Sequence, residues 1–233
     1  TGTREETAEN EKITITKEDF GFQNGKIRVT AKDGGEMVVS SIRRGYGNPS
    51  YAGILDLYAT SEGIVIINEL PVESYLCKVV PSEMPASYEP EALKAQAVCA
   101  RTYVASHMNG SPAYGFDVTG TTTSQVYYGT LDASANSDRA VDETAGKFVR
   151  YEGKLCETFY FAADGGATED SENVWVTAVP YLRGVVDPYE KDIDFYCKSW
   201  STSISRAAVG DVSITYTPIG NACLLYTSDA ADD

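Results

Sequence analysis

The sequence is poor in basic residues, contains a single histidine and lacks any long apolar run. It has 19 Lys and Arg residues against 34 Asp and Glu residues, which gives a net charge of −15. A nucleic acid partner requires a basic surface, so this balance argues against DNA or RNA binding. It also argues against electrostatic attachment to anionic membranes. No stretch is long and apolar enough to span a bilayer as a helix.

Cysteine and histidine are arranged in a way that argues against common metal and redox motifs. The five cysteines, at positions 77, 99, 156, 197 and 223, form no Cys-x-x-Cys pair. A zinc ribbon or a dithiol motif is therefore not expected. Cys99 falls within a helical pattern, where it is most simply a small core residue. His107 follows the same pattern, where a contact with the helix C-terminus is favourable.

The length allows one sizeable core, and both ends of the chain differ from the middle. Residues 1–10 are polar and acidic, which predicts a disordered lead-in. The chain begins at Thr1 without a signal peptide, so we expect a mature domain or a fragment. Residues 222–233 resemble translated adapter read-through, and we expect the domain of residues 11–221 to be truncated at its C-terminus.

The first third of the chain predicts strands. Short β-branched runs alternate with Gly, Asn and Asp turns, at residues 13–16, 26–30, 37–40, 54–58 and 64–67. Later patterns predict a strand at 125–129, a helix at 133–145 that stops at Gly146, and a hairpin that turns at Glu152-Gly153. The predicted fold class is α+β, a mostly antiparallel β assembly around one long helix at about residues 90–109.

The long helix has clear start and stop signals. Pro90 suits a first helical turn, where its missing N–H has no helical partner to lose, and Asn109-Gly110 is a stop signal. Apolar residues at spacings of four, three and four share one face: Leu93, Ala97, Ala100 and Val104. Glu83 precedes this helix in a turn between Pro81 and Pro85. It is either an ordinary surface carboxylate or a fixed, partly desolvated general acid.

Several further residues carry a specific resemblance. The run begins at Asn68-Glu69-Leu70-Pro71, continues through Val79-Val80-Pro81-Ser82-Glu83-Met84-Pro85, and ends at Ala100-Arg101-Thr102-Tyr103. Together with Gln125, Tyr127 and Gly165-Gly166-x-Thr168-Glu169, this run resembles the stage II sporulation protein D family (SpoIID/LytB type) over roughly residues 40–200. The family resemblance implies an extracytoplasmic protein of the cell envelope that degrades peptidoglycan, and it makes Glu83 the catalytic residue.

The implied reaction needs a single carboxyl group. Hydrolytic glycosidases commonly use two carboxyl groups, whereas a lytic transglycosylase can protonate the glycosidic oxygen and then deprotonate the muramic C6 hydroxyl with the same residue. The products are 1,6-anhydromuramic ends, and the expected substrate is glycan denuded of stem peptides. Other members of the family are amidase enhancers, so a non-catalytic peptidoglycan-binding module is the alternative. An N-acetylmuramoyl-L-alanine amidase and other sporulation proteins are possible partners under the resemblance.

The sequence departs from the family pattern in one segment. The family segment that carries Cys, His and Cys as zinc ligands has Thr119, Thr123 and Ser124 here. Neutral hydroxyls are poor zinc ligands, so we predict no metal and no other cofactor. A hydrogen-bonded Thr/Ser bend is an alternative scaffold for this segment.

The remaining candidates are substrate-binding residues, and each has a structural alternative. Arg101 either lines the glycan cleft or forms an internal ion pair, and Gln125 and Tyr127 either contact sugar or pack. For Tyr160, sugar contact and packing are equally compatible with the sequence. Gly165 and Gly166 predict a turn with a close backbone approach, after which Thr168 could reach a ligand. Trp175 is expected in the core rather than as a sugar platform.

Overall fold

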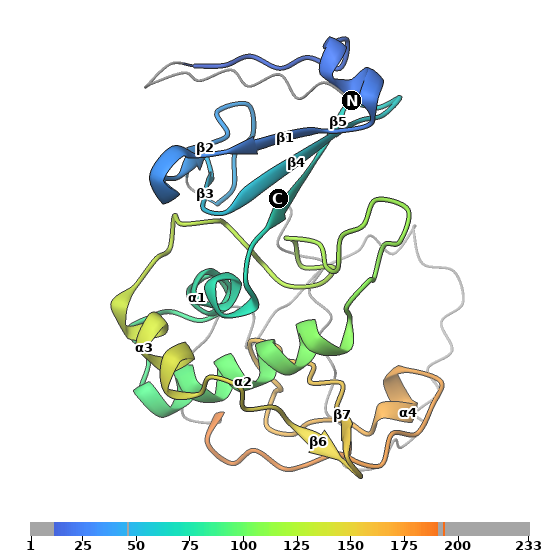
Figure 1. The fold of residues 1–233 in the computed structure, drawn as a ribbon. Coiled ribbons are helices and arrows are strands. Elements are labelled where there is room, and N and C mark those ends of the chain that lie inside the picture. Colours follow the sequence, from blue (N-terminus) through green and yellow to red (C-terminus); the bar gives the residue numbers. More distant parts are fainter. Residues whose placement is uncertain (1–11, 46, 191–192, 194–233) are drawn as a thin grey trace, which may run out of the picture. The chain divides into compact units, whose positions relative to one another are not determined.

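The computed structural model describes residues 12–45, 47–190 and 193. The chain divides into two compact units, the first ending at Phe159 and the second beginning at Tyr160. Figure 1 traces the elements of both units. The predicted lead-in of residues 1–10 and the predicted foreign tail of residues 222–233 lie outside the described residues. The helices and the antiparallel strands together confirm the α+β class.

The first unit begins with a three-stranded antiparallel sheet of order β1-β4-β5. Its strands are Ile27–Thr30, Ile54–Ala59 and Ile64–Glu69, and Leu57 of the central β4 pairs with Ile27 on one side and Ile66 on the other. Two short 3-10 helices, Phe20–Asn24 and Lys32–Gly34, flank β1. A separate ribbon joins β2, Met37–Val38, to β3, Ser50–Tyr51. The β-branched runs thus predicted four of these strands.

The predicted strand at residues 13–16 is wrong. This segment has no strand geometry, and the side chain of Ile13 is 53% exposed. A β-branched run becomes a strand only where a neighbouring strand satisfies its backbone groups.

Three helices follow the sheet in the first unit: α1, Val72–Glu83; α2, Pro90–Ser106; and α3, Ala135–Glu143. In Figure 1, α1 is seen end-on above α2, and α3 lies beside the start of α2. The buried apolar residues that the three helices contribute to the core are Leu76, Val79, Val80, Leu93, Ala97, Ala100, Ala140 and Val141. The small residues of α2 allow this close packing. The long helix predicted at 90–109 is confirmed, with its last regular residue at Ser106.

Helix α1 corrects the prediction that Glu83 lies in a turn. Glu83 is the last residue of α1, and Pro81 lies inside the helix's final turn. A proline there removes one N–H, but the preceding turns are held by buried Leu76, Val79 and Val80. The helix ends because Met84 is extended (φ −139°, ψ 131°), the geometry favoured before a proline.

A loop rather than the predicted strand contains residues 125–129. Its backbone contacts come from two directions: the Gln125 N–H donates to the Thr119 carbonyl (3.4 Å), and the Thr130 N–H donates to the Ser50 carbonyl (2.8 Å). Gly129 has φ 68°, and a Cβ atom there would collide with the Ser50 carbonyl oxygen. The loop is therefore pinned to β3 by a residue that must be glycine.

The last elements of the first unit are a helix that lies within the predicted bounds and a hairpin at the predicted turn. Helix α3 begins after Ser134, whose Oγ accepts the Asn136 N–H, and Gly146 (φ 70°) follows its end. The hairpin comprises β6, Arg150–Tyr151, and β7, Lys154–Leu155. It turns at Glu152 and Gly153, both with positive φ.

In the described residues of the second unit, the regular structure is one short helix, α4, Ser171–Val174, and an isolated bridge between Ala167 and Val186. Trp175, expected in the core, is 43% exposed. It follows α4 directly, and the buried position at this site belongs to Ser171 instead. The prediction for Trp175 is therefore wrong.

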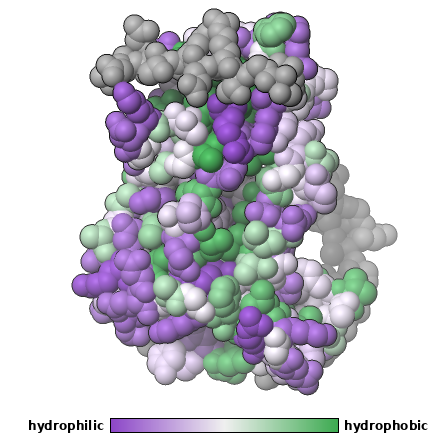
Figure 2. Space-filling view, in the orientation of Figure 1, coloured by the Kyte–Doolittle hydropathy of each residue, from purple (hydrophilic) through white to green (hydrophobic). Residues whose placement is uncertain are grey.

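The surface of the first unit is strongly polar in places. Figure 2 shows hydrophilic residues gathered over α3, whose exposed side chains include Arg139, Asp142 and Glu143. Among the described helices, none combines the length and the apolar character that a membrane span requires.

Candidate functional site

Glu83 is held in a fixed direction by the end of α1 and by the loop that follows Thr119. Its side chain is half-buried, and its Oε1 accepts a hydrogen bond from the Val126 N–H at 2.6 Å. Because this donor belongs to the backbone, the bond is independent of side-chain rotamers on the loop. One oxygen of the carboxyl group is therefore oriented by the fold, as a positioned general acid requires.

The segment that carries Val126 is anchored by buried polar groups. Gln125 is completely buried; its Oε1 accepts from the Tyr75 hydroxyl (3.2 Å), and its Nε2 donates to the Ala100 carbonyl (3.2 Å). This amide links α1 to α2 across the base of the site. A buried amide with both ends hydrogen-bonded is stabilising, whereas an unpaired one is costly.

Tyr127 anchors the same segment to the sheet. Its hydroxyl donates to Asn68 Oδ1 at 2.6 Å, and its ring lies 5.1 Å from the Tyr75 ring centroid. Asn68 in turn donates to the carbonyls of Ala52 and Ile54. Tyr127 is only 7% exposed, so its side chain packs in the interior, which was one of the two roles predicted for it. Contact of Gln125 or Tyr127 with a glycan stays a prediction.

Two phenols share the electrostatic surroundings of Glu83. Burial raises the pKa of Tyr75, and the charges of neighbouring Tyr127 and Glu83 raise it further. Burial also raises the pKa of Tyr103, to which Glu157 and Glu83 add, while a hydrogen bond from Ser124 opposes the shift. Both hydroxyls therefore stay protonated near neutral pH. The sequence placed Tyr103 in the family motif but gave it no role, because the side-chain contacts that define its surroundings come from segments far away in the chain.

The carboxyl group of Asp132 lies close to Ser82, the residue that precedes Glu83 in α1. The Ser82 Oγ donates to the Lys78 carbonyl (2.7 Å) and lies 3.4 Å from Asp132 Oδ2. Burial raises the pKa of Asp132. The sequence gave no signal for this residue, since 50 positions separate the two partners.

The Thr/Ser bend is held together by its own hydrogen bonds. The Ser124 Oγ accepts from the Thr119 N–H (3.2 Å) and from the Thr119 hydroxyl (3.1 Å), and Thr119 Oγ1 lies 3.3 Å from Thr121 Oγ1. Thr123 is exposed. These neutral hydroxyls do not fit a zinc ion, which requires thiolate, imidazole or carboxylate ligands. No group of three or more such ligands occurs within the described part of the chain.

Arg101 is placed in an internal ion pair. Its side chain is fully buried, and its Nε and Nη2 atoms donate to the two carboxylate oxygens of Glu73 at 2.9 and 2.7 Å. Nη2 also reaches the Val141 carbonyl at 3.1 Å. The guanidinium thus joins α2 to α1 and α3. Arg101 therefore forms the internal ion pair that was one of its two predicted roles. A contact between Arg101 and a glycan stays a prediction.

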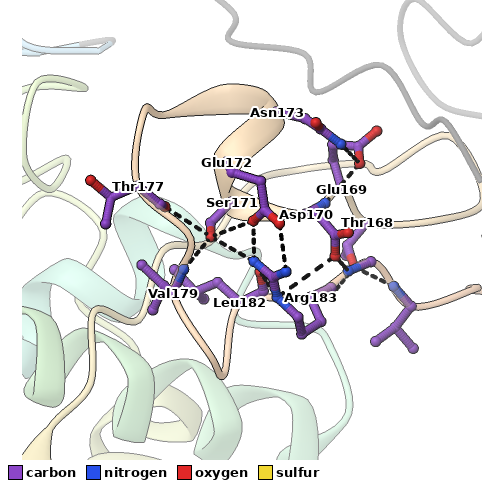
Figure 3. Close-up of polar contacts among 12 residues, drawn as sticks. Thr168, Glu169, Asp170, Ser171, Glu172, Asn173, Thr177, Val179, Leu182 and Arg183 are labelled. Atoms are coloured by element: carbon purple, nitrogen blue, oxygen red, sulfur yellow. Dashed lines mark hydrogen bonds and ion pairs between the residues drawn. The ribbon is translucent and has the colours of Figure 1, made fainter. Parts of the chain in front are cut away.

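Four predicted binding residues belong to the second unit. Gly165 and Gly166 have φ 72° and 107°, which matches the predicted turn. Thr168 faces its own unit in Figure 3: its hydroxyl accepts from the Val185 N–H (2.9 Å) and donates to the Arg183 carbonyl (3.2 Å). Tyr160 is half-buried. The role of these four residues in substrate binding stays a prediction.

The neighbouring contacts in Figure 3 are built around Arg183. Its guanidinium forms a two-point ion pair with Glu172 and donates to the buried Ser171 Oγ at 3.0 Å. This pairing lowers the pKa of Glu172 to about 2. The Asp170 carboxylate accepts the Gly184 N–H at 2.7 Å. These bonds connect the start of α4 to residues 183 and 184.

A shallow cavity of about 210 Å³ lies where α2 begins, close to α3. Its lining comes from the loop before α2, the start of α2 and α3: Ser87, Tyr88, Glu89, Pro90, Leu93, Asn136 and Arg139. Glu83 does not line this cavity. The predicted cleft around Glu83 therefore stays a prediction.

Comparison with known proteins identifies the class. Residues 60–151, which include α1, α2, α3 and the loop that holds Glu83, match the family described as Stage II sporulation protein. The chain is 36% identical over 163 residues to Stage II sporulation protein D of Bacillus amyloliquefaciens, covering 64% of this chain and 47% of the relative. Residues 60–151 of this chain therefore belong to the stage II sporulation protein D family.

Other relatives extend the match. An uncharacterised protein of Brachyspira hyodysenteriae is 35% identical over 199 residues, 84% of this chain and 52% of the relative. The Amidase enhancer of Bacillus subtilis is 39% identical over 139 residues, 60% of this chain and 18% of the relative. The chain thus spans about half, or less, of the length of these relatives.

Proposed function

We propose that this chain carries a peptidoglycan lytic transglycosylase site in which Glu83 is both general acid and general base. The observation that supports the proposal most directly is the 2.6 Å hydrogen bond from the Val126 N–H to Glu83 Oε1. It fixes the carboxyl group at the end of a buried helix, within the matched family region. Cell-wall glycan strands, and action outside the cytoplasm, follow from the family as parts of the same proposal.

The proposed reaction is balanced without water. Glu83 gives its proton to the oxygen of the glycosidic bond, which breaks as the anomeric carbon gains oxocarbenium character. The resulting Glu83 carboxylate then takes the proton of the muramic C6 hydroxyl while that oxygen bonds to C1. The leaving glycan fragment carries a new hydroxyl group, the other fragment ends in a 1,6-anhydro ring, and Glu83 regains its proton.

Product analysis tests this proposal. Purified protein is incubated with glycan strands stripped of stem peptides, and the ends are identified by mass spectrometry. We expect 1,6-anhydromuramic ends, which are lighter by one water than reducing ends. Reducing ends would instead indicate hydrolysis, which commonly uses a second carboxyl group, and Asp132 beside Ser82 would then be tested for that role.

A second candidate function comes from the Bacillus subtilis relative, whose name is Amidase enhancer. In this alternative the chain binds peptidoglycan and stimulates a separate N-acetylmuramoyl-L-alanine amidase. Release of stem peptides by an added amidase, measured with and without this chain, separates the two. Stimulated release without anhydro ends would favour the binding module.

A further inference from the structure

The N–H that binds Glu83 belongs to the peptide unit between Gln125 and Val126. The Val126 N–H donates to Glu83 Oε1 at 2.6 Å, and Gln125 supplies the carbonyl group of the same planar unit. Whatever fixes the backbone of Gln125 therefore also fixes the direction in which this N–H points.

The side chain of Gln125 is attached to two helices. Its Oε1 accepts the Tyr75 hydroxyl of α1, and its Nε2 donates to the Ala100 carbonyl of α2, both at 3.2 Å. Gln125 is 0% exposed, so a shift of its amide would leave polar groups unpaired in the interior, which is costly. A side chain buried in this way offers no surface to a glycan.

The contacts of Gln125 close a circuit on α1. Tyr75 and Glu83 belong to the same helix. From Tyr75 the circuit runs through the Gln125 amide and the Val126 N–H, and it returns to the helix at the Glu83 carboxyl group. Tyr75 is 9% exposed, and its ring lies 5.1 Å from the Tyr127 ring centroid. Both ends of the circuit are therefore held by the same packed helix.

Tyr127 fixes the other side of Val126. Its hydroxyl donates to Asn68 Oδ1 at 2.6 Å, and the Asn68 amide donates to the carbonyls of Ala52 and Ile54. The residue before Val126 is thus attached to the helices and the residue after it to the sheet. The position of the N–H is set by the packed first unit rather than by the loop alone.

The hydrogen bond from Val126 makes the two oxygens of Glu83 different. In the acid form, the oxygen that accepts an N–H is favoured as the carbonyl oxygen, so the transferable proton is carried by Oε2. A rotated or displaced carboxyl group would present that proton in another direction. A misplacement of about 1 Å can reduce a rate about 10²-fold. The anchor of this peptide unit should therefore affect turnover more than binding.

We infer that Gln125 is a positioning residue for the proposed reaction: with Tyr75, it holds the Gln125–Val126 peptide unit so that the N–H keeps Glu83 Oε1 in place and the proton on Oε2. This inference rests on the proposed function, because it assumes that Glu83 transfers a proton. It assigns a role to two buried side chains that need not touch the glycan.

Two variants remove the anchor in steps. Tyr75→Phe keeps the ring and removes the donor to Gln125, whereas Gln125→Met keeps a side chain of similar length and removes both hydrogen bonds. We expect kcat for the formation of 1,6-anhydromuramic ends to fall about tenfold for Tyr75→Phe and about 10²-fold for Gln125→Met. KM should be unchanged, and so should the affinity for denuded strands when each change is made in a Glu83→Gln background.

A second measurement follows the hydrogen bond itself. In ¹⁵N-labelled protein, a short hydrogen bond to a carboxyl group moves the Val126 amide proton downfield and slows its exchange with solvent. We expect both variants to move this signal upfield and to accelerate its exchange. Because this measurement needs neither substrate nor turnover, it tests the anchor separately from the proposed enzyme.

Thr158→Val is the matched control. Thr158 is 9% exposed, and its hydroxyl donates at 2.8 Å to the carbonyl of Cys99, the residue before Ala100 in α2. The variant therefore also loses a hydrogen bond to the backbone of α2, at a place that does not hold Val126. It should melt at a lower temperature than the parent while kcat and the Val126 signal stay unchanged. Thermal melting of every variant confirms that the fold is retained.

An unchanged Val126 signal in Gln125→Met would overturn the inference, as would an equal fall of kcat in Thr158→Val. A higher KM with kcat retained would also overturn it and would make Gln125 a substrate contact. If Gln125→Met does not fold, Tyr75→Phe decides, and normal kcat with an unchanged signal would overturn the inference. A displaced Val126 signal, in a protein whose parent forms no anhydro ends, would refute the proposed enzyme while supporting the anchoring of Glu83 by Gln125.

Discussion

Arg101 and Glu73 form a two-point ion pair whose partners differ sharply in exposure. The Arg101 side chain is 0% exposed and that of Glu73 is 43% exposed. The pair joins α2 to the first turn of α1, and Arg101 also reaches the Val141 carbonyl of α3. Glu73 can be solvated by water when its partner is removed, but Arg101 cannot. The two single substitutions should therefore differ in cost.

We expect Glu73→Ala to be the more destabilising of the two substitutions. It should lower the free energy of unfolding by about 3 kcal/mol, because it leaves a buried guanidinium without its counter-charge. Arg101→Met should cost less, since its stem volume is kept and the remaining carboxylate is half in water. Urea unfolding of both variants, with exposed Glu62→Ala as the control, measures the difference. A larger loss for Arg101→Met would contradict this account of the pair.

Glu83→Gln tests the proposed chemistry. The amide keeps the shape and can accept the Val126 N–H, but it has no proton to transfer. General acid–base help contributes about 10²–10⁴-fold, so formation of anhydro ends should fall by at least the upper part of that range. The melting temperature should be almost unchanged.

The control for Glu83→Gln is Glu91→Gln, on a side chain that is 84% exposed and pairs with Lys94. It should retain full activity. Near-normal turnover by Glu83→Gln, or a loss that only follows a fall in melting temperature, would remove Glu83 from the proposed mechanism.

Acid sensitivity should arise in part from Asp56 on β4. This residue is 4% exposed, and hydrogen bonds from Arg28 (2.7 Å to each oxygen) and Lys26 lower its pKa. A carboxyl group with a lower pKa in the folded state adds stability above its unfolded pKa, about 3.9. That stability is lost as the pH falls through the folded value.

The Asp56→Asn variant should be less stable than the parent at neutral pH, and its stability should fall less steeply below about pH 4. The contribution is moderated by solvent, because the Arg28 side chain is 45% exposed. Chemical unfolding across a pH series measures both slopes. Parallel curves for parent and variant would show that Asp56 is not linked to acid unfolding.

Tyr127→Phe separates the structural from the binding role of this residue. The change removes the donor to Asn68 Oδ1, which should lower the stability by about 1 kcal/mol. Because the ring is buried between Tyr51 and Tyr75, glycan affinity should not change. Weaker glycan binding at unchanged stability would instead support the sequence-based prediction that Tyr127 contacts substrate.

Chelation tests the prediction that the Thr/Ser bend holds no zinc. Thr119, Thr123 and Ser124 supply only neutral hydroxyls, so treatment with EDTA should leave both the melting temperature and the glycan affinity unchanged. Elemental analysis of the untreated protein should show no stoichiometric zinc. A fall in melting temperature that added zinc restores would show that other residues hold a metal.

The sequence predicted best where the pattern is local. The proline start and the apolar periodicity of α2 lie within its own residues, and the turn at Glu152-Gly153 needs only two adjacent positions with positive φ. Helix α1 was not predicted, because Pro81 and Pro85 were interpreted as the two ends of a turn, although Leu76, Val79 and Val80 have helical spacing. Here core packing outweighed the proline's local preference.

The site was predictable only in part, because its contacts join distant segments. The family motif named Glu83, but the Val126 N–H that orients it lies 43 positions away. Arg101, Gln125 and Tyr127 could be selected from the sequence, yet their burial depends on α1, α3 and the sheet.

The contact between Gly129 and the Ser50 carbonyl limits how the family loop can change in length. Three positions separate Gly129 from Val126, and both ends of this short span are fixed, one on β3 and the other on Glu83. An inserted or deleted residue between them would shift Val126 out of register with the carboxylate. Length variation among relatives should therefore be concentrated in the exposed stretch between Gly110 and Gly115, upstream of the bend, and should be excluded from positions 126–129.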